Sequence, residues 1–207
     1  MRIPLFANNL FSIHIDHNTD ELKKDKTFST SIKYENEHGK QPKEEVSFHV
    51  LEKYPQVKNI LLNEWNKIAK EVLFYPNDFM ISTSWFTKVL KGDESQPHLH
   101  KNSFYSGVYY FDDYGKDSSA LEFYNPLLPF SDFQLEPTQY NATNSYSWKI
   151  KPEKNLLILF PSFIEHKILK NNSDSPRRSL AFNIIPINEY GYADSFMNLG
   201  WKGLTVK

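Results

Sequence analysis

The 207-residue chain has a formal net charge of −1, with 24 Lys and Arg residues against 25 Asp and Glu residues. This balance provides no overall field to attract a nucleic acid or an anionic membrane, so we expect neither as a partner. Hydrophobic residues make up 40% of the chain and aromatic residues 15%, which excludes a wholly disordered protein. The length favours a single domain over residues 1–207.

The chain contains no cysteine. A disulfide, a zinc finger, an iron–sulfur cluster and a thiol nucleophile are therefore excluded, and any metal must be held by His, Asp or Glu. No stretch approaches the roughly 20 apolar residues of a membrane span, and the N-terminus does not have the pattern of a signal peptide. We therefore expect a soluble, cytoplasmic protein.

Residues 1–78 are predicted to form a supporting strand and helix. Alternation over Leu10–Asp16 predicts a strand, and Asp20–Lys26 is interpreted as a charged connector. A helix is expected from Pro55 to about Tyr75, because apolar residues recur near the 3.6-residue period and Pro is allowed in the first turn. The periodic residues are Val57, Ile60, Leu61, Trp65, Ile68, Val72 and Leu73.

Residues 79–186 change to short runs rich in β-branched and aromatic residues, separated by Gly, Pro, Asn and Asp, which predict strands. The expected strands are Phe79–Leu90, Ser103–Phe111, Leu121–Tyr124, Tyr146–Ile150, Leu156–Phe160, Glu165–Leu169 and Ser179–Ile185. Many short strands indicate a mainly β fold with supporting helices, of the sandwich or jelly-roll type.

Two segments lie outside this strand pattern. Asn125–Ser145 is long for a connector in a compact β domain, so we interpret it as a mobile cover at the barrel mouth. It carries the apolar residues Leu127, Leu128, Phe130 and Phe133. The C-terminal tail, residues 187–207, is rich in aromatic residues, and we expect it to pack on the body or on the second subunit of a homodimer.

The clearest candidate for metal binding is His98-Leu99-His100. Two residues apart on an extended segment, His98 and His100 present both imidazoles on one face, which is a chelating geometry. Two surface histidines beside a turn would give the same pattern. The pattern alone does not decide between a metal site and surface residues.

A third histidine, His166, comes after an apolar strand and the turn at Phe160-Pro161-Ser162, and Arg177 lies eleven positions beyond it. Only three arginines occur in the chain, so an Arg that opens an apolar strand indicates a need for a planar, bidentate donor to a carboxylate. Alternation sends Arg177, Ser179, Ala181 and Asn183 to one face and Arg178 to the other. A salt bridge at the rim is the alternative interpretation of Arg177.

The ordered set of His-x-His, a later lone His and Arg-x-Ser resembles the non-haem Fe(II)- and 2-oxoglutarate-dependent oxygenases, especially a phage and bacterial subgroup. The resemblance covers about residues 80–186. The residues that carry it are His98-Leu99-His100, Ser106-Gly107-Val108-Tyr109-Tyr110, Leu121-Glu122-Phe123, Phe160-Pro161-Ser162, His166 and Arg177-Arg178-Ser179-Leu180-Ala181-Phe182-Asn183.

The resemblance implies a double-stranded β-helix, a cupin-like jelly roll, with Fe(II) at its mouth and 2-oxoglutarate as co-substrate. By strand position, His98 and His166 would be iron ligands and Arg177 would bind the distal carboxylate of 2-oxoglutarate. Ser179 and Tyr110 would also bind 2-oxoglutarate, and Tyr110 stands where related prolyl hydroxylases have a Tyr that touches the distal carboxylate. An ordinary core aromatic is the alternative interpretation of Tyr110. The resemblance implies no catalytic residue beyond the metal centre.

One position departs from the family pattern, because His100 stands where an Asp or Glu is expected. Three alternatives remain open at this point. In the first alternative, the site has three His ligands. In the second, a carboxylate from Glu122, Asp112 or Asp113 is the third ligand. In the third, the position is vacant, as in halogenases. The first is the simplest, because His100 faces the same way as His98.

We therefore expect a dioxygenase that uses O₂ and hydroxylates an unidentified protein or small-molecule substrate, releasing succinate and CO₂, in a bacterium or phage-infected host. A protein side chain such as prolyl is the first substrate to consider. The rival predictions are a three-His, cupin-like dioxygenase without 2-oxoglutarate and a non-enzymatic jelly-roll module. The remaining histidines are interpreted as surface or strand residues: His14, His17, His38 and His49.

Overall fold

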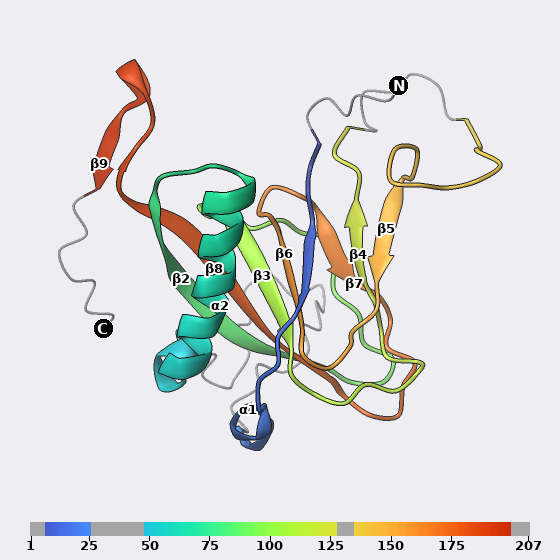
Figure 1. Ribbon diagram of the computed structural model, residues 1–207. Helices are drawn as coiled ribbons and strands as arrows, with labels where there is room; N and C mark the ends of the chain where they lie inside the picture. The colour runs from blue at the N-terminus through green and yellow to red at the C-terminus, as the bar shows by residue number, and fades with distance from the viewer. Residues whose placement is uncertain (1–6, 26–47, 128–134, 200–207) are drawn as a thin grey trace, which may run out of the picture.

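Two antiparallel sheets enclose the inner core of the protein (Figure 1). The computed structural model describes residues 7–25, 48–127 and 135–199. The larger sheet contains, in hydrogen-bonded order, β1 (Phe11–His14), β6 (Leu156–Pro161), β3 (Tyr105–Tyr110), β8 (Arg177–Tyr190) and β2 (Asp78–Val89), and β9 (Met197–Leu199) pairs with the end of β8. The smaller sheet has the order β5 (Ser147–Ile150), β4 (Leu121–Tyr124) and β7 (His166–Ile168).

The inner faces of the two sheets pack against each other. Phe160 and Ala181 of the larger sheet share one buried cluster with Leu121 and Phe123 of the smaller sheet. Every expected strand is present, and the mainly β, jelly-roll double-stranded β-helix is confirmed. The division of the chain into a support, a core and a tail stays a prediction.

Helix α2 (Pro55–Lys67) covers the outer face of the larger sheet (Figure 1). Its buried residues Val57, Leu61 and Trp65 join a second cluster with residues of β8 such as Leu180 and Phe182. The expected helix reaches Tyr75, but in the structure the α-helix passes into a π-helical turn, Ile68–Val72. No helix among the described residues is long and apolar enough to span a membrane.

The interpretation of Asp20–Lys26 as a connector is wrong for its described part, because Asp20–Lys24 forms the short helix α1. Leu22 is fully buried and gives this otherwise charged segment an apolar anchor. The amide of Asp20 donates to Oδ1 of Asn18, and acidic residues precede basic ones, as the helix dipole favours. A single buried Leu is too weak a sequence signal to predict this helix.

In its described part, the tail contacts the body through Ile187, which pairs with Asp78, and through the carbonyl of Glu189, which accepts from Asn77, but not beyond these residues. Strand β8 continues beyond the sheet core and turns back as β9, and this hairpin projects from the body (Figure 1). Tyr192 is 87% exposed and Phe196 55% exposed. The expectation of packing on the body is therefore wrong for these residues, and packing on a second subunit stays a prediction.

Gly107 allows β3 and β8 to pack closely. It pairs with Phe182 in the register, and a Cβ atom at Gly107 would lie 2.2 Å from Cζ of the Phe182 ring. Backbone and aromatic ring can approach this closely only where no side chain stands between them.

We predict that Gly107→Ala destabilises the protein by about 1–3 kcal/mol, because the fully buried Phe182 ring has little room to move. Urea unfolding followed by circular dichroism measures the change. Gly115→Ala is the matched control, since the nearest atom to its new Cβ would be Oγ of Ser173 at 3.4 Å. Equal stability of the two variants would show that the Phe182 ring can relax.

Candidate active site

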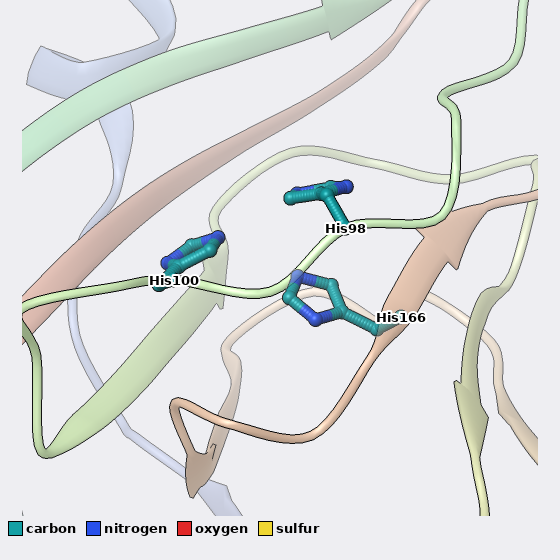
Figure 2. Close-up of side chains that lie close together, drawn as sticks. All are labelled: His98, His100 and His166. Carbon is teal, nitrogen blue, oxygen red and sulfur yellow. The ribbon is translucent and has the colours of Figure 1, made fainter.

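Three imidazoles meet at one end of the space between the sheets. His98 and His100 lie on the segment between β2 and β3, and His166 opens β7 (Figure 2). A ligand nitrogen from each of the three residues lies within 4.8 Å of those of the other two. The ring centroids of His98 and His166 are 4.5 Å apart, and those of His100 and His166 are 5.1 Å apart.

Backbone hydrogen bonds fix the position of this cluster. The amide of His98 donates to the carbonyl of His166 at 2.9 Å, and the amide of His166 donates back to His98 at the same distance. The amide of His100 donates to the carbonyl of Ser162 at 3.0 Å. The segment that carries His98 and His100 is thereby attached to β7 and to the turn before it.

Hydrogen bonds also define which ring nitrogen of each histidine is free. Nδ1 of His98 donates to the carbonyl of Gln96, and Nδ1 of His166 donates to the carbonyl of Ile164. Because a carbonyl can only accept, these two rings carry their proton on Nδ1 when neutral, which leaves the lone pair on Nε2. Nδ1 of His100 lies 2.6 Å from Oδ1 of Asn183 and is held in the same way.

The environment keeps the buried imidazoles uncharged. Burial, together with the adjacent His98, lowers the pKa of His166 to about 3. Burial and His98 also lower the pKa of His100, against an opposing effect of the hydrogen bond to Asn183. Neutral imidazole is the form that binds a transition metal, so both rings are in that form near pH 7.

No carboxylate of the described residues joins the three imidazoles. Oε1 of Glu122 accepts from Ser147, and its other oxygen accepts from Tyr124. The pKa of Glu122 is lowered, because these hydrogen bonds and Lys149 outweigh the opposing effect of burial. Glu122, one of the carboxylates considered as a third ligand, is therefore engaged elsewhere.

The two aspartates considered as ligands are also engaged elsewhere. Oδ2 of Asp112 accepts from Nε of Arg178, and Asp113 pairs with Lys23 and Lys154. The geometry favours the three-His alternative over a carboxylate from either position.

Arg177 is fully buried between the sheets. Its Nε donates to the carbonyl of Ser119 at 3.0 Å, and Nη1 donates to Oγ of Ser179 at 3.2 Å. Nη2 donates to the hydroxyl of Tyr110 at 2.8 Å, and the guanidinium lies 5.0 Å from the centre of the Tyr110 ring. The rim salt bridge considered for Arg177 is wrong, since no carboxylate in the described ranges pairs with it.

The inward face of β8 carries Arg177 and also reaches the histidine cluster. Arg177, Ser179 and Ala181 are buried, and the next inward residue of β8, Asn183, contacts His100. Arg178 points to the opposite face and pairs with Asp112. The alternation expected for β8 is confirmed, and the structure brings Tyr110 and Ser179 to Arg177.

Several residues near the cluster were not predicted as site residues. Asn183 and Ser106 contact Nδ1 of His100, and the Trp85 ring lies 5.4 Å from the His100 ring. Ser119 supplies a carbonyl to Arg177, and its own hydroxyl is buried without a hydrogen-bond partner among the described residues. Alternation places Asn183 on the face of Arg177, but its contact with His100 depends on pairing between distant strands.

The remaining histidines in the described ranges lie outside the cluster. His14 is exposed and pairs with Glu153, and His49 forms an isolated bridge with Ser84. His17 is half-buried. Residue His38 lies outside the described residues, as do Leu128, Phe130 and Phe133 of the expected cover, so that cover stays a prediction.

Comparisons with solved structures return matches at low identity, and the first two below share the fold. HygX from Streptomyces hygroscopicus, solved with iron bound, is 10% identical with a TM-score of 0.53, and the match covers 91% of this chain and 87% of HygX. EvdMO1 is 11% identical with a TM-score of 0.54, over 86% of this chain and 47% of EvdMO1. A Pseudomonas putida prolyl-4-hydroxylase is 18% identical with a TM-score of 0.44, over 62% and 64% of the two chains.

The chain thus spans about half of EvdMO1 and just under two thirds of the hydroxylase. No curated protein matches the sequence. A family model described as a putative 2OG-Fe(II) oxygenase matches residues 83–183, which include the three histidines and Arg177. This match, over just under half of the chain, supports membership of the 2-oxoglutarate- and Fe(II)-dependent oxygenases, a superfamily of oxidoreductases that use Fe(II) and 2-oxoglutarate.

Proposed function

We propose that this chain is a dioxygenase in which His98, His100 and His166 bind Fe(II) and Arg177 binds the distal carboxylate of 2-oxoglutarate. The observation that carries the proposal is a cluster of three imidazoles together with a buried guanidinium that lacks a carboxylate partner among the described residues. Imidazole is a suitable ligand for iron, and three protein ligands leave positions for a co-substrate and O₂.

The residues around Arg177 fit a bound carboxylate. A guanidinium has five N–H donors, and three of them are used on neutral oxygens. Tyr110 and Ser179 accept from Arg177, and neither hydroxyl donates to a group in the described ranges. The buried hydroxyl of Ser119 has no partner there either. These unused donors would bind an anion that supplies several acceptor oxygens.

When bound together, Fe(II) and 2-oxoglutarate supply the oxidising chemistry, in which O₂ gives one oxygen atom to the substrate and one to succinate, with release of CO₂. The protein orients the reactants for this chemistry. Arg177 and its hydroxyl neighbours would bind one carboxylate of the co-substrate, and the three imidazoles would hold the metal. Phe123 and Phe160 pack on His166 and exclude water from that side of the site.

Peptides that contain prolyl residues are the first substrates to test, on the resemblance of the sequence alone. Hydroxylation with release of succinate and CO₂ is the reaction proposed for them.

An anaerobic titration tests the proposal. Fe(II) is added first and 2-oxoglutarate second, and the metal-to-ligand charge-transfer absorption is recorded. We expect the band only when both are present. Iron binding without the band would favour the cupin-like dioxygenase that does not use 2-oxoglutarate, and absence of iron binding would favour a non-enzymatic module.

We predict that His98→Ala, His100→Ala and His166→Ala each abolish stoichiometric Fe(II) binding, because each removes one of three ligands. His100→Asp keeps binding, since it gives two histidines and one carboxylate. Anaerobic calorimetry measures the stoichiometry and affinity, with Glu122→Ala as the control. Loss of iron binding in Glu122→Ala but not in His100→Ala would contradict the three-His site.

We also predict that Arg177→Ala raises the apparent dissociation constant of 2-oxoglutarate at least ~30-fold. Loss of one partner of a buried, charge-assisted pair costs about 2–5 kcal/mol of binding free energy. Arg178→Ala is the matched control, because Arg178 pairs with Asp112 on the opposite face. Titration of the charge-transfer band measures both constants. Equal effects of the two substitutions would contradict the assignment of Arg177.

A further inference from the structure

His100 differs from the other two histidines in what holds its ring. The Nδ1 atoms of His98 and His166 donate to backbone carbonyls, of Gln96 and Ile164. Nδ1 of His100 has only side-chain partners, Oδ1 of Asn183 at 2.6 Å and Oγ of Ser106 at 3.0 Å, among the described residues. The orientation of the His100 ring therefore depends on residues that a substitution can change.

Asn183 is itself held by a neighbour on the next strand. Its Nδ2 donates to Oγ1 of Thr83 at 3.0 Å, and Thr83 is its register partner on β2. This bond turns the amide oxygen toward His100, where it accepts from the ring and from the hydroxyl of Ser106 at 2.9 Å. On the central strand β8, Asn183 lies between Thr83 of β2 and Ser106 of β3.

Ser106 links this group to the segment before β7. Its hydroxyl lies 2.8 Å from Oγ of Ser162, which donates to Oγ of Ser103 at 2.9 Å. The carbonyl of the same Ser162 accepts from the amide of His100. The ring and the backbone of His100 are thus attached to one hydrogen-bonded network.

We propose that Asn183, oriented by Thr83, is the positioning residue for His100, keeping the proton on Nδ1 and turning Nε2 toward the metal. This inference rests on the proposed function, because it takes His100 as a ligand. Without an acceptor at position 183 the His100 ring can rotate, and its proton can move to Nε2, the atom that must be free. Hydrogen-bond partners of this kind typically change metal affinity by about 10–100-fold.

The test uses Co(II) as a spectroscopic metal probe and the full chain. We expect Asn183→Ala to weaken Co(II) binding by about 10–100-fold and to alter the ligand-field absorption of bound Co(II). Asn183→Asp keeps an acceptor for Nδ1, so its affinity should stay within about threefold of the unmodified protein. Thr83→Val removes the group that orients the amide and should weaken binding to a smaller degree.

Ser103→Ala is the matched control, since Ser103 belongs to the same network but does not touch His100 or Asn183. Its Co(II) affinity should be unchanged. Circular dichroism and thermal unfolding of each metal-free variant show whether it is folded, and affinities are compared per folded protein. Near-native Co(II) affinity in Asn183→Asp would show that position 183 acts as a hydrogen-bond acceptor for His100. If Asn183 were needed only for packing, the half-buried charge of Asp would be tolerated poorly and the affinity would fall.

Three results would overturn the inference. If the unmodified protein binds neither Co(II) nor Fe(II), the proposed function fails as well. If the unmodified protein binds metal and Asn183→Ala binds equally well, the proposed function stands and the positioning role is wrong. If Asn183→Ala and Asn183→Asp are weakened alike, Asn183 is a packing residue rather than the partner of His100.

Discussion

Burial of the Arg177 charge is the constraint around which this fold is arranged. A guanidinium taken out of water is costly unless its donors are bonded and its charge is balanced. The structure meets the first requirement in part, with the Ser119 carbonyl and the hydroxyls of Ser179 and Tyr110. It does not meet the second within the described residues. An anionic ligand is therefore the physical complement of the folded protein, and the proposed co-substrate supplies that charge.

Strand β8 connects the two ends of the proposed site. Arg177 and Asn183 lie six residues apart on its inner face, one beside Tyr110 and the other beside His100. A register slip of one residue would turn both side chains outward and bring Arg178 inward. Pairing of β8 with β2 on one side and with β3 on the other prevents such a slip. The close packing of Phe182 over Gly107 also opposes it sterically. The stability of the sheet and the geometry of the site thus depend on the same pairing.

The sequence was sufficient to predict contacts that depend on local spacing. Alternation places Arg177 inward and Arg178 outward, and the two-residue spacing places His98 and His100 on one face. Contacts across strands could not be predicted in this way. Thr83 faces Asn183 only because the β2 register shifts between Ile81 and Thr83, and no turn or repeat in the sequence marks that shift. Helix α1 was missed for a similar reason, since the burial of Leu22 depends on the body it packs against.

Replacement of a carboxylate by His100 changes how charge is distributed in the proposed site. Three imidazole ligands bring no negative charge to a divalent metal, and the buried Arg177 adds a further positive charge to the proposed site. A dianionic co-substrate would offset two of these three positive charges. Since charge interactions are strengthened where water is excluded, metal and co-substrate should each favour binding of the other. With three His ligands the proposed site would keep one positive charge that a carboxylate ligand would have offset, and Asn183 leaves this charge unchanged because it offers His100 an uncharged acceptor.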